Sequence, residues 1–166
     1  MKIAVSIEKM IHFYHGSLHD INHFLKVFSY AKTIGEQENL ASTTQEILEV
    51  AAVVHDIACP LCREKYGNTN GKVQEKEGAP LARQFLRDLD YNESFIDRVC
   101  YLVAHHHTYT EVDGLDYQIL LEADFLVNAD ESKLPINSIN NMMKRVFKTE
   151  TGIRLLRSIY PVADAQ

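Results

Sequence analysis

The sequence predicts an all-α protein, a compact bundle of several helices. Seven Gly and four Pro among 166 residues are about half the usual share, and this scarcity of turn-forming residues favours helices. Apolar residues recur at intervals of three and four in most segments, whereas no segment alternates as a half-buried strand does. The length fits one domain, so we expect residues 1–166 to form a single unit, with a motif-bearing core at about 18–130 and C-terminal helices at about 135–160.

The apolar periodicity locates the helices in chain order. A first helix at roughly 3–13 has the weakest pattern, and the others have a clear apolar face. These are expected at about 17–34, 44–58, from 80 onward, 93–106, 116–129, from 135 onward, and 151–160. We interpret the longer segments between them, 59–78 and 108–115, as loops, and a polar loop as long as 59–78 is often functional.

Three helix starts carry local signals. Ser17 with Asp20, and Thr43 with Glu46, have the spacing of capping boxes, in which side chains satisfy free backbone N–H groups of the first turn. Pro80 precedes an apolar stripe, and proline at the first position of a helix loses no hydrogen bond. We therefore expect helices to begin at these three places.

Charge and composition argue against several classes of function. A formal net charge of −6 does not suit a nucleic-acid polymer as partner, because binding its backbone needs a basic face. No apolar run approaches the ~20 residues of a membrane span, and the apolar segment at 3–7 is too short for a signal peptide. Three cysteines form no disulfide framework, and Cys59-x-x-Cys62 lacks two further ligands for structural zinc. We expect a cytoplasmic protein with no membrane partner, and its oligomeric state stays open.

Three of the expected helices carry a metal-binding side chain where a hydrophobic residue is expected. Asp124 and His55 each continue an apolar face, Asp56 lies at the edge of the same face as His55, and His23 lies beside the apolar face of its helix. Burying an unpaired carboxylate costs several kcal/mol, so Asp124 must find a cation or take up a proton. A single buried histidine is more often a hydrogen-bonded core residue than a ligand, so the prediction depends on all four residues together.

Two histidine nitrogens and two carboxylate oxygens form a ligand set of intermediate hardness. Such a set suits Mn, Fe, Co, Ni or Zn, and fits Mg or Ca less well. The sequence therefore predicts a divalent metal ion held by His23, His55, Asp56 and Asp124, with Mg as an alternative.

The order of these residues resembles the HD superfamily of metal-dependent phosphohydrolases. His23 lies in INHFLKV, His55 and Asp56 in AAVVHDIA, and Asp124 in LLEADFL, over a span of roughly 18–130. The resemblance implies a helical fold, these four residues as metal ligands, and further site residues at a His-rich helix end, which here is 105–107.

The three consecutive histidines differ in their helical position. His106 continues the apolar face of its helix and is expected to point inward, and His105 is the next candidate. His107 is expected to face solvent or to interact with the C-terminus of the helix, where a cation is favoured.

The chain departs from many two-metal members of the superfamily at Gln74, where they carry a histidine. Glu75 or Glu77 could ligate an ion or position water there instead. The sequence therefore predicts one ion and leaves a second ion open.

The resemblance implies hydrolysis of a nucleotide or another small phosphate ester by water that the bound ion activates. Asp56 could serve as both ligand and proton acceptor, and His105 and His106 would bind the phosphate or donate a proton to the leaving group. Further candidates for contact with the substrate are Lys26, Arg63, Lys65, Lys72, Glu75 and Glu77. Two alternatives stay open, a di-iron oxygenase resembling myo-inositol oxygenase and a non-catalytic domain that senses a nucleotide.

Overall fold

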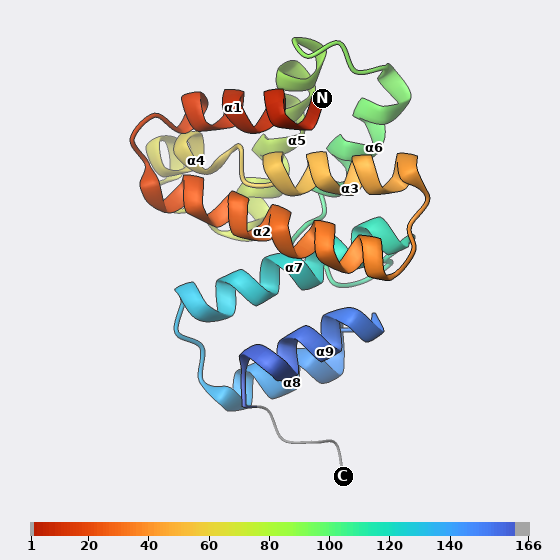
Figure 1. The fold of residues 1–166 in the computed structure, drawn as a ribbon. Coiled ribbons are helices and arrows are strands. Elements are labelled where there is room, and N and C mark those ends of the chain that lie inside the picture. Colours follow the sequence, from red (N-terminus) through yellow and green to blue (C-terminus); the bar gives the residue numbers. More distant parts are fainter. Residues whose placement is uncertain (1, 162–166) are drawn as a thin grey trace.

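The computed structural model describes residues 2–161, and within this range it contains nine α-helices and no strand (Figure 1). The all-α prediction is therefore confirmed for the described part of the chain. The helices are α1 (Lys2–Tyr14), α2 (Leu18–Gln37), α3 (Ser42–Val54), α4 (Cys59–Tyr66), α5 (Gly71–Arg87), α6 (Glu93–Val103), α7 (Leu115–Glu131), α8 (Ile136–Val146) and α9 (Glu150–Ile159). None of the helices in residues 2–161 combines the length and the apolar character that crossing a bilayer requires.

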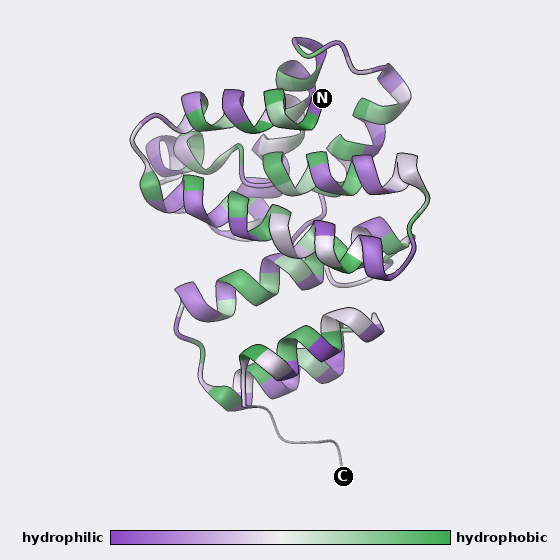
Figure 2. Cartoon of the chain, in the orientation of Figure 1, coloured by the Kyte–Doolittle hydropathy of each residue, from purple (hydrophilic) through white to green (hydrophobic). Residues whose placement is uncertain are grey.

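Helix α7 is the centre of the bundle. It packs against α2 and α3 on one side and against α8 and α9 on the other (Figure 1). Thirteen of its 17 residues are buried, so it is enclosed on almost every face. Hydrophobic and hydrophilic residues instead alternate along α2 and α3, as expected for helices with one buried face (Figure 2). Polar residues in the first ten positions of α7, Asp124 among them, are consequently placed inside the protein.

Helices α2 and α3 approach each other closely at Gly35. A Cβ atom built at Gly35 would lie 3.0 Å from Leu48 Cδ2, which is closer than side chains normally pack. The absence of a side chain at Gly35 therefore allows the two helices to pack, and their pairing fixes the position of the residues that follow α3.

The prediction of a loop over 59–78 and of a helix that starts at Pro80 is wrong. The segment forms α4 and the first half of α5, with Gly67 in a left-handed conformation (φ 67°) ending α4. Pro80 lies inside α5. Proline cannot donate to the carbonyl four residues earlier, but both Pro80 and Lys76 are exposed, so water can satisfy that carbonyl.

Several helix ends also differ from the prediction. Ser17 precedes α2 but donates its hydroxyl to Asp20 Oδ2 (2.6 Å) rather than accepting from the backbone. Helix α3 begins at Ser42, so Thr43 lies inside the helix and makes no capping box with Glu46. Helices α3 and α6 end at Val54 and Val103, three to four residues earlier than expected, and each is followed by a turn.

Candidate metal centre

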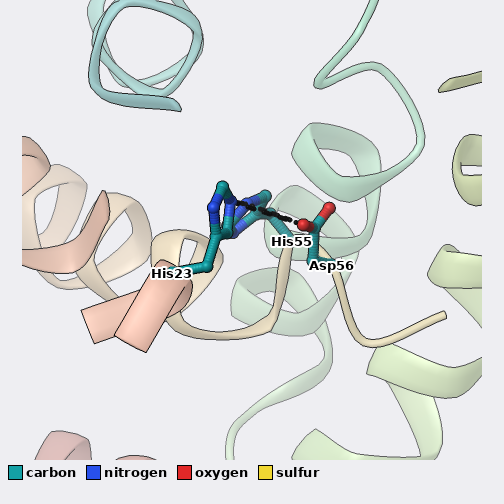
Figure 3. Close-up of side chains that lie close together, drawn as sticks. All are labelled: His23, His55 and Asp56. Atoms are coloured by element: carbon teal, nitrogen blue, oxygen red, sulfur yellow. Dashed lines mark hydrogen bonds and ion pairs between the residues drawn. The ribbon is translucent and has the colours of Figure 1, made fainter. Parts of the chain in front are cut away.

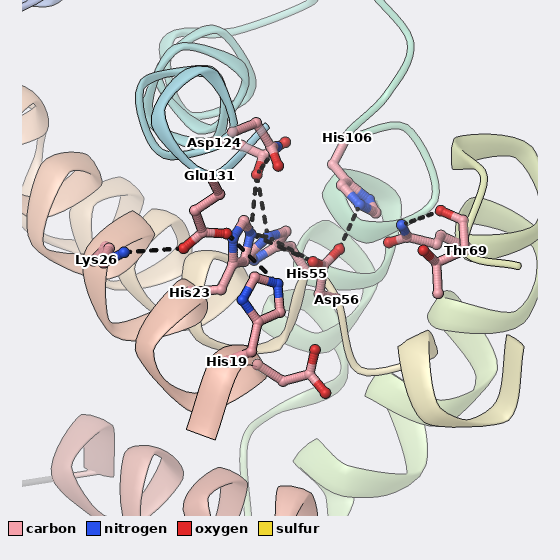
Figure 4. Close-up of polar contacts among 12 residues, drawn as sticks. His19, His23, Lys26, His55, Asp56, Thr69, His106, Asp124 and Glu131 are labelled. Atoms are coloured by element: carbon pink, nitrogen blue, oxygen red, sulfur yellow. Dashed lines mark hydrogen bonds and ion pairs between the residues drawn. The ribbon is translucent and has the colours of Figure 1, made fainter. Parts of the chain in front are cut away.

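Four side chains from three parts of the fold converge beside α7. His23 comes from the second turn of α2, His55 and Asp56 from the turn that follows α3, and Asp124 from α7. The three residues other than Asp56 are at most 5% exposed. Figure 3 shows His23 facing His55 and Asp56, and Figure 4 adds Asp124 and the surrounding polar residues.

The donor atoms of these residues are closely spaced. His23 Nε2 lies 3.2 Å from His55 Nε2, 3.4 Å from Asp56 Oδ2 and 3.3 Å from Asp124 Oδ1. His55 Nε2 lies 3.6 Å from Asp56 Oδ2 and 3.5 Å from Asp124 Oδ1. Ligands that bind one ion at about 2.1 Å lie about 3.0–3.4 Å from each other. The three separations from His23 lie in that range and the two from His55 to the carboxylates exceed it by 0.1–0.2 Å, so small side-chain shifts let the four residues fit a divalent ion of intermediate hardness.

Backbone acceptors fix the orientation of two histidine rings. His55 Nδ1 lies 2.8 Å from the carbonyl oxygen of Ala52, and His106 Nδ1 lies 2.7 Å from that of Val103. A carbonyl oxygen can only accept, so Nδ1 donates in both rings. In a neutral ring, Nε2 then keeps a free lone pair for a metal ion or a hydrogen bond.

The cluster holds opposite charges together in the metal-free protein. Burial alone lowers the pKa of His23, but the contact with Asp124 and the charge of Asp56 outweigh burial and raise the pKa to about 10. Burial raises the pKa of Asp124, but its contacts with His23 and His55 hold the pKa well below its usual value. A protonated imidazole thus balances the carboxylates, and a divalent cation could take its place.

A second group of possible ligands adjoins the first and shares Asp56 with it. Donor atoms of Asp56, His106 and His107 all lie within 4.8 Å of one another, and His106 Nε2 is 3.2 Å from Asp56 Oδ1. His107 Nε2 and Gln74 Oε1 are buried without a hydrogen-bond partner among the described residues. Burial and the charge of His106 lower the pKa of His107 to about 4, so its ring is neutral near pH 7. These residues could hold a second ion.

A cavity of about 530 Å³ opens beside the cluster. His23 and Asp56 contribute to its lining, and Arg63 places a guanidinium group there that is bound to Asp20. Hydrophobic and aromatic side chains complete part of the lining, namely Tyr109, Phe125, Leu134 and Met142. The cavity therefore offers polar, cationic and apolar contacts to a small molecule.

The predicted lysines are not among the residues that line this cavity. Lys26 Nζ pairs with Glu131 Oε1 at 3.0 Å. Lys65 pairs with Glu77 at 2.9 Å on the protein surface, and Lys72 is exposed in the first turn of α5. Of the basic residues predicted to contact substrate, Arg63 is the one that lines the cavity in the described structure.

The structure also corrects the positions of the histidines at 105–107. His105 donates from Nδ1 to the Tyr101 carbonyl (2.7 Å) and stacks on the Tyr101 ring, so it does not reach the cluster. His107, expected to face solvent, instead lines the cavity. The reason is that α6 ends at Val103 and the chain turns. Glu75 holds this turn by accepting from His107 N (3.0 Å) and Thr108 Oγ1 (2.9 Å).

Sequence reasoning did not identify Glu131, whose carboxylate lies 2.8 Å from His23 Nδ1. A signal was present, because Glu131 follows Asp124 by seven residues and therefore lies on the same face of α7 two turns later. Asp20 was likewise not identified as a candidate, although it precedes His23 by three residues on α2.

Comparison with known families identifies this arrangement. A family model for the HD domain matches residues 20–135. The chain belongs to the HD domain family. The residues 23, 55, 56 and 124 that suggested the resemblance all lie within the matched range.

The fold of this HD domain is similar to a solved structure of the same superfamily. That crystal structure is of a predicted HD superfamily hydrolase from an uncultured Thermotogales bacterium, with a TM-score of 0.65 and 24% sequence identity. The similarity covers 96% of this chain and 83% of the other, and it establishes a shared fold. No curated protein matches the chain.

Proposed function

We propose that this HD domain is a metal-dependent phosphohydrolase that acts on a nucleotide or another small phosphate ester. The observation that carries the proposal is the convergence of His23, His55, Asp56 and Asp124 beside a cavity large enough for a small molecule. A bound divalent ion would supply Lewis acidity, which activates water and polarises a phosphoryl oxygen.

The protein residues have separate roles in this proposal. The Oδ2 atom of Asp56 faces the proposed ion site, and its Oδ1 atom contacts His106 Nε2. His106 therefore orients the Asp56 carboxylate. Burial lowers the pKa of His106, but its hydrogen bond to Asp56 raises the pKa overall and, in the metal-free protein, favours a protonated ring that keeps this contact. Burial raises the pKa of Asp56, but the charge of His55 and the hydrogen bond with His106 hold it well below its usual value, so Asp56 stays ionised as a ligand and is a weak proton acceptor. Neutral His107 is placed to accept a hydrogen bond or a proton beside the cavity.

The cavity lining is consistent with a phosphate ester that has an organic group. Arg63 donates from Nη1 and Nη2 to Asp20, and the remaining N–H groups of its guanidinium can bind phosphate oxygens. Phe125 and Tyr109 offer apolar and aromatic surface for the organic part, such as a nucleobase. A cation beside apolar and aromatic surface should bind a phosphate ester with an apolar or aromatic group more tightly than it binds inorganic phosphate.

Elemental analysis of the purified protein, followed by a screen of phosphorylated metabolites and a generic aryl phosphate, tests this proposal. We expect a bound divalent metal, loss of turnover after chelation, and recovery when Mn²⁺, Co²⁺, Ni²⁺, Fe²⁺ or Zn²⁺ is restored. A protein that binds a metal and a nucleotide but hydrolyses no phosphate ester would contradict the enzymatic assignment and support a sensing role.

The cluster of Asp56, His106 and His107 also favours a two-ion centre, which the oxygenase alternative needs. Measurements on the same purified protein distinguish a phosphohydrolase from an oxygenase. Tightly bound iron with an optical absorption band and oxygen uptake would support the oxygenase, whereas phosphate release without oxygen uptake supports hydrolysis.

A further inference from the structure

His23 differs from the other two histidines of the centre in what holds its ring. His55 and His106 follow the ends of α3 and α6, and each donates to a carbonyl of the last helical turn. Such carbonyls are free because they have no partner within the helix. His23 lies in the second turn of α2, where the nearby carbonyls already accept hydrogen bonds within the helix. Its Nδ1 therefore needs an acceptor from another element.

Glu131, the last residue of α7, supplies that acceptor. Its Oε2 lies 2.8 Å from His23 Nδ1, while Asp124 Oδ1 lies 3.3 Å from His23 Nε2 (Figure 4). Asp124 and Glu131 are separated by two turns of α7, so one face of this helix contacts both nitrogens of the same ring. The Glu131 side chain is 13% exposed, which limits competition from water.

The second oxygen of Glu131 is also occupied. Lys26 Nζ lies 3.0 Å from Oε1, and Lys26 follows His23 by one turn on α2. The lysine thus fixes the carboxylate from the side opposite His23 and balances its charge. This contact gives Lys26 a role in holding Glu131, whereas the sequence analysis predicted that Lys26 contacts the substrate.

We propose that Glu131 is a positioning residue of the metal centre, which holds the proton of His23 on Nδ1 and so leaves Nε2 free to bind the ion. The proposal rests on the metal-binding part of the proposed function. An ionised carboxylate can only accept, so Nδ1 must donate to it. A carboxylate in this position also makes the histidine a stronger ligand, and loss of such a partner typically lowers metal affinity about 10- to 100-fold.

The test compares zinc and manganese affinities of the full-length protein and its variants by isothermal titration calorimetry with a competing chelator. We expect Glu131→Ala to weaken zinc binding about 10- to 100-fold. Glu131→Gln keeps an acceptor oxygen and is expected to recover most of that loss. A matched control, Asp130→Ala, should stay within about threefold of wild type, because it removes an exposed charge next to Glu131 without removing the acceptor.

Nitrogen-15 NMR of the histidine rings in the zinc-bound protein gives a readout independent of affinity. The wild type should show a protected Nδ1–H signal for His23, and Glu131→Ala should lose that signal while circular dichroism stays unchanged. Equal zinc affinity in wild type and Glu131→Ala would overturn the proposal, and so would an equal loss in Asp130→Ala, which would indicate a general effect of charge at this end of α7. If the wild type binds neither ion, the proposed function fails as well; if it binds both and Glu131→Ala has no effect, only the present inference fails.

Discussion

His55 and Asp56 are neighbours in the chain, and their side chains nevertheless reach the same point, with His55 Nε2 3.6 Å from Asp56 Oδ2. Adjacent residues of helical backbone point about 100° apart, and His55 keeps helical angles (φ −54°, ψ −40°), so the two side chains meet at a point that lies between their directions. Helix α3 ends at Val54, and the pair lies in the turn before α4. The dipeptide therefore directs two ligand atoms to one point, and the burial of α3 holds it against His23.

Replacement of Asp56 by asparagine should remove metal binding and turnover while leaving the helices intact. The amide keeps the shape of the carboxylate but loses the charge that faces both His23 and His106. We expect metal affinity to fall by at least about 100-fold, beyond the loss typical of an outer-shell partner. Metal content, hydrolysis of an aryl phosphate and circular dichroism check this expectation. Asp97→Asn, an exposed carboxylate on α6, is the control, and a variant at Asp56 that retained metal and activity would contradict the proposed centre.

Metal affinity should rise with pH. In the metal-free protein, contacts with Asp124 and Asp56 overcome the effect of burial and raise the pKa of His23 to about 10. His23 is therefore protonated between pH 6 and 8, and an ion must displace that proton. Because a higher pH reduces the competition, we expect affinity to increase about tenfold per pH unit for each proton displaced. Calorimetric metal titrations in buffers of different ionisation enthalpy measure the number of protons released. A metal affinity that does not depend on pH would show that metal binding does not displace the proton of His23.

The helices could be predicted from the sequence where their buried face is apolar. They could not be predicted where the buried face carries polar residues or glycine. Helix α5 shows the limit, because its buried residues in the first half are Gln74 and Gly78. Neither contributes to an apolar stripe, so the periodicity began only near Ala82, and Pro80 was interpreted as the start. Helix α4 is only eight residues long and lacks a stripe of useful length. Packing against other elements determines both helices.

The candidate site shows the same limit. Asp124 could be identified because a carboxylate interrupts an apolar face, and this pattern is visible along the chain. Glu131 shares a face of α7 with Asp124, but its role was not identified because it depends on α2 lying next to α7. The position of His107 depends on the turn after Val103 and could not be predicted. The candidate lysines at 26 and 65 show the opposite error, since charge alone does not reveal that a nearby glutamate already binds each of them.

Glu122 should matter for stability and not for metal binding. It is fully buried on α7, and its Oε1 accepts from Gln118 Nε2 (2.7 Å), Lys148 N (2.7 Å) and Thr149 N (3.0 Å). Glu122→Ala leaves these donors without their acceptor and should lower the free energy of unfolding by about 2–4 kcal/mol. Urea unfolding measures the change. Glu64→Ala, an exposed site on α4, should change stability by less than about 0.5 kcal/mol. Unfolding curves that coincide for wild type and Glu122→Ala would refute this role.

Arg63 provides the sharpest test of the substrate class. Its guanidinium lines the cavity and is held by Asp20, with Nη1 3.3 Å from Oδ1, so it is oriented before a ligand arrives. A charge-assisted contact to phosphate is worth about 1.5–3 kcal/mol, and Arg63→Ala should therefore raise KM for a phosphate ester about 10- to 100-fold. Metal affinity should not change, because Arg63 is not among the proposed ligands.

The conservative variant and a matched control refine this last prediction. Arg63→Lys keeps the charge but loses the two-pronged geometry, so its KM should fall between those of wild type and Arg63→Ala. Lys65→Ala removes a nearby cation that pairs with Glu77 away from the cavity, and it should leave KM unchanged. If Lys65→Ala and Arg63→Ala raise KM equally, the effect comes from the general charge of α4. If neither raises it, the phosphate does not bind at Arg63, and the substrate must be held by other residues of the cavity.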